Sequence, residues 1–232
     1  MEDILRRGLT ALGLGTETVP ALTDFARRLL TQNQVMNLTA ITQPDEVARL
    51  HLLDCAAVAR YVDLRGKRAV DVGTGAGFPG MVLRLLEPDF DLTLLDSLGK
   101  RVDWLATVCG DMGLDRVECV HARAEEFAAQ RRETYDLAFS RAVASLNVLC
   151  ELTLPLVKVG GVMVAMKSVN CDEEVDAARG AVGQLGGKFL PSIDYAIPGT
   201  GVTHRLVRIE KVRPTPAQFP RPYARIKKQP LK

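Results

Sequence analysis

The sequence predicts an α/β protein with a mostly parallel sheet, preceded by a helical extension. Three observations support this fold class. Apolar residues recur at helical spacing through about the first 60 residues. Beyond residue 67, short apolar runs alternate with helical stretches, and a glycine-rich turn joins the first run to the first stretch. The length of 232 residues suits one ordinary domain, and 47% apolar residues can form its core.

Residues 1–62 are expected to form a helical cap on that domain. Leu22, Phe25 and Leu29 share one face of a helix, and a second apolar face follows after residue 46. The segment 37–39 interrupts the helical pattern, and Pro44 stands in the first turn of the next helix.

Residues 63–213 hold the alternating strands and helices. Strands are expected at 68–72, 91–96, 117–121, 135–140 and 160–167, and helices at 79–87, 99–113, 124–130, 145–157 and 171–185. Short apolar strands separated by single helices are typical of a parallel sheet. The alternating run 204–212 is expected to form an edge strand.

The C-terminal 28 residues differ in charge from the rest of the chain. The whole chain carries +2, but residues 205–232 hold nine basic residues and one acid, a net +8. Residues 1–204, with 21 basic and 27 acidic residues, therefore carry −6. A local positive patch attracts polyanions in a way that the overall charge conceals.

Four prolines between residues 214 and 222 disfavour regular structure, so residues 214–232 are expected to form an extended basic arm. The arm is either a solvated tail or a nucleic-acid contact. The candidates for binding nucleic-acid phosphates are Arg221, Arg225, Lys227 and Lys228 on the arm and Arg123 on the body.

The cysteines and histidines indicate the compartment. Five cysteines form no C-x-x-C pair, and three histidines show no metal-ligand spacing. No stretch is long and apolar enough to cross a membrane, and the N-terminus lacks the pattern of a signal peptide. We expect a cytoplasmic protein with no metal site and no membrane contact.

The glycine-rich loop DVGTGAGFPG (71–80) follows the first expected strand. Gly75 to Gly80 fits G-x-G-x-x-G, the dinucleotide fingerprint. The pattern Asp71-x-Gly73-x-Gly75-x-Gly77 instead resembles the acidic loop of S-adenosylmethionine-dependent methyltransferases. That cofactor carries an ammonium and a sulfonium but no phosphate, so a carboxylate beside the loop favours the second interpretation.

Acidic residues also follow the next two strands. Asp96 ends the second strand, where a carboxylate can accept hydrogen bonds from both ribose hydroxyls of either cofactor. Its alternative role is to cap the following helix. Ala124 and Glu125 follow the third strand, where this architecture places an adenine, although an acidic first helical turn would look the same.

The segment Ser140-Arg141-Ala142 after the fourth strand lacks two catalytic motifs. It has neither the Asp/Asn-Pro-Pro-aromatic loop of amino-directed nucleic-acid methyltransferases nor the Cys nucleophile of the cytosine-C5 class. Guanine N7 has an in-plane lone pair and needs no general base, so orientation can be the main contribution to its methylation. No catalytic residue is assigned. Arg141 is the candidate for holding the cofactor or positioning the base, with a structural ion pair as the alternative.

Six stretches carry a family resemblance: NLTAI (37–41), HLLDC (51–55), DVGTGAGFPG (71–80), LTLLDSLGKRVDWL (92–105), ARAEEF (122–127) and SRAVASL (140–146). Together they resemble the ribosomal small-subunit methyltransferase G family, also called glucose-inhibited division protein B. The resemblance implies a seven-stranded Rossmann-like sheet over the methyltransferase domain. It also implies S-adenosylmethionine-dependent formation of 7-methylguanosine at guanine 527, in the 530 loop of 16S rRNA.

The resemblance further implies that the protein is a monomer that acts on 16S rRNA or the small ribosomal subunit. The cofactor contacts that it implies are Gly73, Phe78, Ala124, Glu125 and Arg141, with Asp96 at the ribose. Two other functions stay open. One is an NAD-dependent oxidoreductase, for which no hydride-transfer acid or base is identifiable after the loop. The other is a non-catalytic RNA-binding protein that keeps a cofactor as part of its fold.

Overall fold

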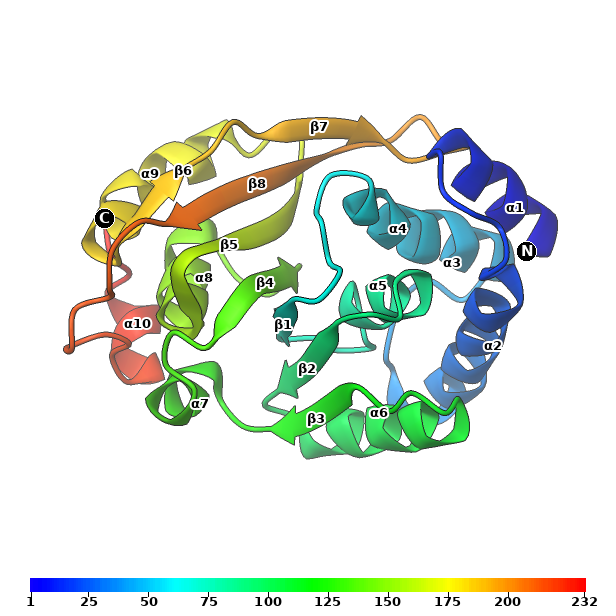
Figure 1. Cartoon of the computed structure of the whole chain (residues 1–232), viewed down its shortest axis with the longest axis horizontal. Coiled ribbons are helices and arrows are strands. Elements are labelled where there is room, and N and C mark those ends of the chain that lie inside the picture. Colours follow the sequence, from blue (N-terminus) through cyan, green and yellow to red (C-terminus); the bar gives the residue numbers. More distant parts are fainter.

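An eight-stranded sheet in the order β3-β2-β1-β4-β5-β8-β6, with β7 paired to β8, is the frame of the protein (Figure 1). The computed structural model describes all 232 residues. Strands β1 to β5 pair in parallel, and β8 is antiparallel to β5, β6 and β7. The strands are β1 (Arg68–Val72), β2 (Asp91–Asp96), β3 (Val117–His121), β4 (Tyr135–Arg141), β5 (Val157–Ser168), β6 (Gly187–Phe189), β7 (Ile193–Ala196) and β8 (Thr203–Lys211).

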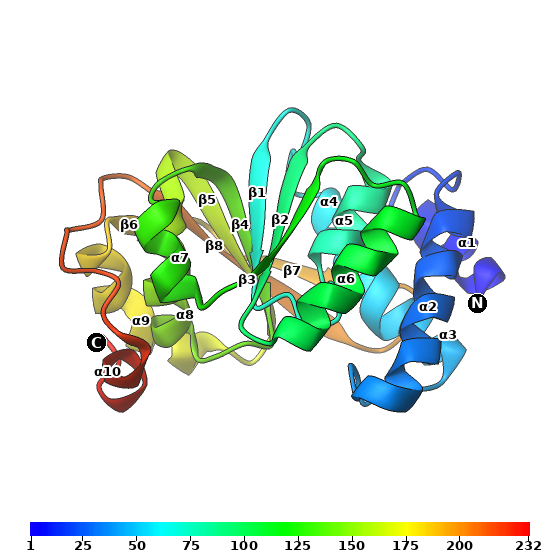
Figure 2. The same cartoon turned by 90° about the horizontal axis from the view of Figure 1, so that it is seen from below.

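Helices cover both faces of this sheet (Figure 2). Those that follow the N-terminal segment are α5 (Gly80–Leu86), α6 (Gly99–Asp111), α7 (Ala124–Gln130), α8 (Leu146–Thr153), α9 (Asp172–Gln184) and α10 (Tyr223–Lys228). Successive strand residues face opposite ways, so Ala69 joins the core under α5 and α6, whereas Val70 joins the core under α8 and α9. The α/β class with its parallel strands is confirmed.

The N-terminal helices share a core with one face of the sheet. They are α1 (Glu2–Ala11), α2 (Val19–Met36), α3 (Pro44–Val47), the π-helix η1 (Ala48–Leu53) and α4 (Asp54–Ala59). Leu22, Phe25 and Leu29 are fully buried, as their helical spacing predicted, and Phe25 contacts Phe78 and Trp104 at ring-centroid distances of 5.7 and 6.4 Å. Residues 1–62 therefore pack directly onto the α/β core. The N- and C-termini lie at opposite ends of the long axis (Figure 1).

The prediction for residues 204–212 was wrong in one respect. They form a strand, β8, but it lies between β5 and β6, and β7 adds to the same side. The prediction missed β6 and β7 because strands of three and four residues are too short to show an alternating pattern. The sheet accordingly has eight strands, one more than the family resemblance implied.

The C-terminal segment is not an extended arm. Phe219 and Ile226 are buried, and the chain forms a helix, α10, as soon as the last of the four prolines has passed. Arg132 helps to hold the proline-rich stretch, because its guanidinium donates hydrogen bonds to the carbonyls of Thr215, Pro216 and Phe219. The prolines supply no N–H to a regular element, so side-chain donors and apolar contacts stabilise the segment instead.

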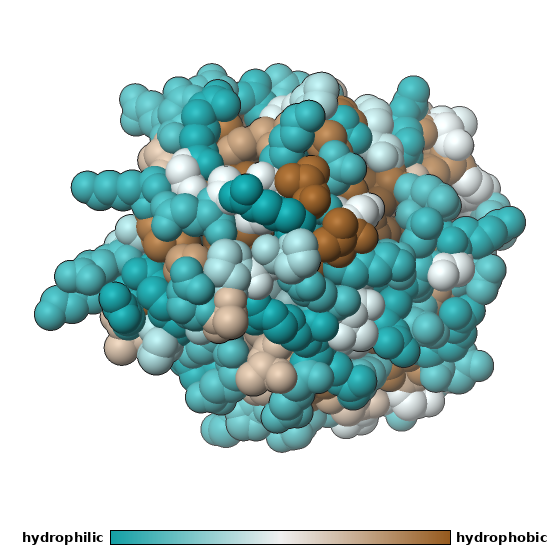
Figure 3. Space-filling view, turned by 60° about the vertical axis from the view of Figure 1, so that its left-hand side comes forward, coloured by the Kyte–Doolittle hydropathy of each residue, from teal (hydrophilic) through white to brown (hydrophobic).

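The surface on which this segment lies is largely hydrophilic, with apolar residues showing in patches (Figure 3). No helix combines the length and the hydropathy that crossing a bilayer requires.

Candidate functional site

A pocket of about 310 Å³ opens at the carboxyl ends of β1, β2 and β4. Ligands of open α/β sheets bind at this edge, where the strand order reverses. Gly73 after β1, Asp96 at the end of β2, and Ala124 and Glu125 at the start of α7 all line it. The structure thus brings together four of the residues that the sequence predicted to bind a cofactor.

Asp96 forms part of the pocket lining and is only 6% exposed. Its Oδ2 accepts a hydrogen bond from the Gly75 amide (2.9 Å), and its Oδ1 accepts one from the Leu98 amide (2.9 Å). Helix α6 begins at Gly99 with Leu98 as its N-cap residue, so Asp96 is not the helix cap. Each carboxylate oxygen keeps a second lone pair, so Asp96 can accept hydrogen bonds from a diol.

Asp71 lies beneath the glycine loop and does not line the pocket. Its Oδ2 accepts hydrogen bonds from the Thr74 hydroxyl (2.7 Å) and the Gly80 amide (2.8 Å), which ties together the two ends of the loop. Its Oδ1 is buried without a partner. Burial raises the pKa of Asp71 to about 6.

This position of Asp71 bears on the choice between the two cofactor classes. A dinucleotide places its pyrophosphate on the N-terminal amides of the helix after the loop. Here the amide of Gly80, the first residue of α5, already donates to the Asp71 carboxylate. A diphosphate would meet an acidic group where it needs free donors, so the geometry disfavours the G-x-G-x-x-G interpretation.

The glycines of the loop have different roles. Gly73 lines the pocket with φ +70°, a conformation that favours glycine, and a Cβ there would lie 2.6 Å from Cγ2 of Val143. Gly77 does not line the pocket; a Cβ there would meet Met81 and Leu105 in the core. Gly75 also lies outside the pocket lining and donates its amide to Asp96.

Two exposed apolar side chains border the pocket. Leu98 is 51% exposed after β2, and Val143 is 38% exposed after β4. Between them the pocket offers apolar surface beside the Asp96 carboxylate, while Arg101 and Arg123 add positive charge. Such a mixture suits a ligand with a flat apolar ring and polar hydroxyls.

Phe78 and Arg141 lie outside this pocket, in a second cluster under the N-terminal helices. The guanidinium carbon of Arg141 is 4.8 Å from the centroid of the Phe78 ring, and the His51 ring stacks on Phe78 at 4.7 Å. Arg141 donates to Asp54 Oδ2 (3.1 Å) and to His51 Nδ1 (3.0 Å). The structure therefore favours the alternative role for Arg141, a structural ion pair.

Asp54 is the centre of this second cluster and was not predicted. It is 1% exposed, and its Oδ1 accepts hydrogen bonds from the Tyr195 hydroxyl (2.7 Å) and from His204 Nδ1 (2.8 Å). Burial alone would raise the pKa of Asp54, but the bonds from His204 and Tyr195 and the charge of Arg141 outweigh it, so that the pKa falls.

His51 is neutral in this cluster. Burial, helped by the charge of Arg141, lowers the pKa of His51 to about 4. An arginine can only donate, so His51 Nδ1 is the acceptor and Nε2 carries the hydrogen, which points to Thr39 Oγ1 at 2.7 Å. His51 and Asp54 both lie in the HLLDC stretch (51–55), one of the six stretches that carry the family resemblance.

The basic residues that the sequence predicted to contact phosphates differ in whether they already form ion pairs within the protein. The Arg221 guanidinium donates to both carboxylate oxygens of the fully buried Glu151 (2.8 and 2.6 Å), so Arg221 is a structural anchor rather than a free cation. Arg225, Lys227 and Lys228 are exposed and form no ion pair. Arg123 pairs with Glu125 (2.5 Å) beside the pocket.

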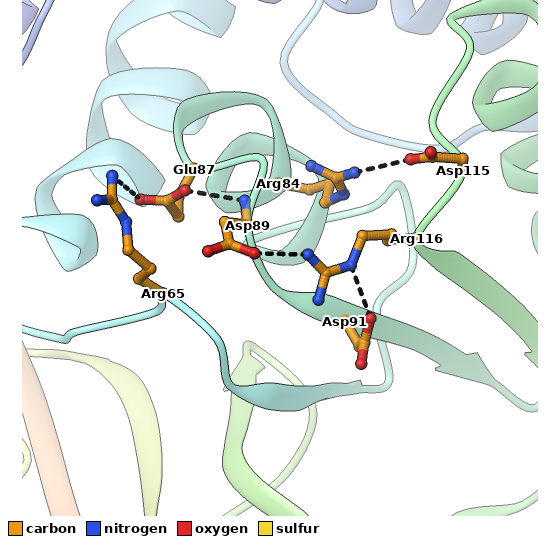
Figure 4. A network of polar contacts seen from close by, with 7 residues as sticks. All are labelled: Arg65, Arg84, Glu87, Asp89, Asp91, Asp115 and Arg116. Atoms are coloured by element: carbon orange, nitrogen blue, oxygen red, sulfur yellow. Dashed lines mark hydrogen bonds and ion pairs between the residues drawn. The ribbon is translucent and has the colours of Figure 1, made fainter.

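A further polar network lies at the opposite end of the strands (Figure 4). Arg116 binds Asp89 (2.7 Å) and Asp91 (2.9 Å) at the start of β2. Neighbouring pairs join Arg84 to Asp115 (3.3 Å) and Arg65 to Glu87 (3.4 Å). Because these groups sit at the amino ends of the strands, they do not contribute to the pocket. No group of His, Cys, Asp and Glu side chains could hold a metal ion.

Comparison with known proteins identifies the relatives of this chain. The family model described as rRNA small subunit methyltransferase G (GidB) matches residues 18–191. The chain is 44% identical to ribosomal RNA small subunit methyltransferase G of Clostridium botulinum (strain ATCC 19397 / Type A), over 91% of this chain and 90% of that protein. It is 42% identical to the protein of the same name from Alkaliphilus oremlandii, over 100% and 99% of the two chains.

The fold resembles that of solved methyltransferases. A SAM-dependent methyltransferase from Aquifex aeolicus superposes with a TM-score of 0.55 at 16% identity, covering 76% of this chain and 97% of the other. At that identity the likeness concerns the fold alone.

Proposed function

Because this chain belongs to the rRNA small subunit methyltransferase G family, we propose that it methylates N7 of guanine 527 in 16S rRNA, with S-adenosylmethionine as the methyl donor. The observation that carries the proposal is the Asp96 carboxylate in the pocket, within a chain that matches this family over most of its length. The proposed setting is a monomer in the cytoplasm acting on naked 16S rRNA or the small subunit.

The residues of the pocket fit S-adenosylmethionine. The two free lone pairs of Asp96 suit the ribose hydroxyls. Backbone groups at Ala124 and the Glu125 carboxylate are proposed to bind the adenine, with Leu98 beside the ring. The φ of +70° at Gly73 lets the backbone come close to the methionine part.

The other loop residues support the site without lining it. We propose that Asp71, Gly75 and Gly77 act by fixing the loop, since the Asp71 carboxylate bridges Thr74 and Gly80. Phe78 belongs to the cluster around Arg141. An acidic group below the loop also favours a cationic ligand over an anionic one.

Methylation of guanine N7 requires no general base from the protein. When bound, S-adenosylmethionine would supply an electrophilic methyl group: the N7 lone pair would form the new bond to the methyl carbon as the bond from that carbon to sulfur breaks, with S-adenosylhomocysteine as the leaving group and no proton lost. The chain contributes orientation, which can supply up to about 7–11 kcal/mol of the barrier reduction. Arg141 is the last residue of β4, and the Asp54 ion pair fixes its guanidinium. We propose that Arg141 acts by positioning its neighbours His51 and Phe78.

The RNA side of the proposal depends on the exposed cations of α10. Arg225, Lys227 and Lys228 are free to contact phosphates, and such contacts supply affinity without reading sequence. The target guanine must leave its stack to reach the pocket.

The test is to incubate the protein with labelled S-adenosylmethionine and small subunits, or their rRNA, that lack the modification. Mapping of the labelled base should place it at N7 of a single guanine. Label on cytosine or adenine would refute the proposal. Thermal shift with S-adenosylhomocysteine and NAD in parallel separates the cofactor classes, since only the ligand that binds the folded state raises Tm.

A further inference from the structure

The C-terminal segment reaches the pocket through Tyr223. This residue opens α10 and lines the same pocket as Glu125, although nearly 100 residues separate the two in sequence. The guanidinium carbon of Arg123 lies 4.1 Å from the centroid of the Tyr223 ring, and Arg123 Nε is 2.5 Å from Glu125 Oε1. A cation on an aromatic face and an ion pair thus connect Tyr223 to the pocket wall.

Tyr223 is fixed in this position from both sides. Two residues before it, Arg221 donates both its backbone amide and its guanidinium to Glu151, which is fully buried. Three residues after it, Ile226 is fully buried against Val148 and Leu152 of α8. A helix of six residues is not stable alone, so these contacts hold α10 in place.

The outward side of the same helix is cationic. Tyr223 and Ile226 are one helical turn apart and face the protein, whereas Arg225, Lys227 and Lys228 are exposed. The helix therefore has one surface on the pocket and another suited to phosphates.

We propose that the segment 220–228 is a wall of the cofactor pocket and couples cofactor binding to RNA binding. Tyr223 holds Arg123 and Glu125 in position for the adenosine end of the cofactor, while Arg225, Lys227 and Lys228 bind RNA phosphates. This inference rests on the proposed function, from which it takes the cofactor and the substrate class.

The coupling follows from linkage. The coupling requires that α10, a helix of six residues, leaves its docked position for part of the time. On this proposal both ligands bind the docked position more tightly, so each stabilises the arrangement that the other prefers. The factor by which RNA raises the affinity for cofactor must then equal the factor by which cofactor raises the affinity for RNA.

Calorimetry with S-adenosylhomocysteine tests the wall. Tyr223→Ala in the full-length chain should weaken binding by about tenfold, because Arg123 and Glu125 lose their support. Tyr223→Phe is the matched control: it keeps the ring and should bind within about twofold of wild type. Equal affinity of Tyr223→Ala and wild type, with both variants folded by circular dichroism, would overturn the inference.

The coupling is measured by repeating the titration with a saturating hairpin fragment of 16S rRNA. RNA should raise the affinity of wild type for S-adenosylhomocysteine, so the ratio of the affinity with RNA to the affinity without RNA should exceed one. In the double variant Lys227→Ala/Lys228→Ala this ratio should be close to one. Lys188→Ala, which removes an exposed lysine on β6, is the control and should keep the wild-type ratio. A ratio of one in wild type contradicts the coupling.

Trypsin cleavage tests the docking of α10 in the wild-type chain, without any substitution. Addition of S-adenosylhomocysteine should slow cutting after Arg225, Lys227 and Lys228, because ligand bound at Tyr223 suppresses undocking of α10. Unchanged cutting would contradict the inference. If the wild type binds S-adenosylhomocysteine and this ligand protects α10 from trypsin, but the protein methylates no guanine, the proposed function is refuted. The inference that the segment 220–228 forms a wall of the pocket would still hold.

Discussion

The carboxylate of Asp54, in the N-terminal helices, holds the guanidinium of Arg141 at the end of β4, with Oδ2 3.1 Å from Nη1. The other oxygen of Asp54 accepts bonds from Tyr195 and His204 on β7 and β8. One buried carboxylate therefore joins the N-terminal helices to the last residue of β4 and to strands β7 and β8. The N-terminal helices thereby fix the orientation of the Arg141 guanidinium.

Asp54→Asn should destabilise the protein by about 3–5 kcal/mol. The substitution leaves the Arg141 charge buried without its partner, and a broken buried pair costs about this much. Urea unfolding measures the effect. Asp176→Asn breaks an exposed pair with Arg179 and is the control, for which no measurable change is expected. Equal stability of the two variants would show that the Asp54 pair contributes nothing.

Asp71 should make stability depend on pH in the acid range. Its pKa rises from 3.8 in the unfolded chain to about 6 in the folded protein, so the folded state binds the proton more tightly. The stability contributed by this proton is fully present below pH 3.8 and is lost as pH rises through about 6. Above that value the buried charge costs on the order of 3 kcal/mol.

Asp71→Asn tests this dependence. An amide oxygen can still accept from Thr74 and Gly80, while no charge forms. The difference in unfolding free energy between wild type and variant should therefore change between about pH 4 and 6 in favour of the variant, and stay constant above. A difference that is constant across this range would mean that Asp71 titrates normally.

The parts predicted correctly depend on local pattern or on topology. The strands β1 to β5 follow from apolar runs, and Gly73 and Asp96 meet because parallel strands bring their carboxyl ends to one edge. The pair Arg141 and Asp54 was missed because 87 residues separate them and no periodicity connects them. The docking of Ile226 was missed for a similar reason: its partners lie on α8, and the charges around it indicated a solvated arm.

Gly73→Asp should abolish binding of S-adenosylhomocysteine. The new Cβ would lie 2.6 Å from Val143 in a left-handed backbone, and both residues line the pocket, so the added carboxylate would take up space that the ligand needs. Gly113→Asp separates the two effects, because Gly113 has a similar φ of +65° but open space around it. Both variants should lose about 1–2 kcal/mol of stability, yet only the first should fail to bind in calorimetry. If Gly73→Asp binds S-adenosylhomocysteine with the affinity of wild type, the cofactor does not bind beside Gly73.

The salt dependence of RNA binding should report the exposed cations of α10. Each phosphate contact contributes about 0.7 to the slope of log affinity against log salt for a single strand and about 0.9 for a duplex. The triple variant Arg225→Gln/Lys227→Gln/Lys228→Gln should therefore lower the slope by about 2 to 3, measured by filter binding of 16S rRNA across a salt series. Lys188→Gln, which removes an exposed lysine on β6, is the control, and its slope should stay close to that of wild type. An unchanged slope in the triple variant, or an equal fall of the slope in Lys188→Gln, would place the phosphate contacts outside α10.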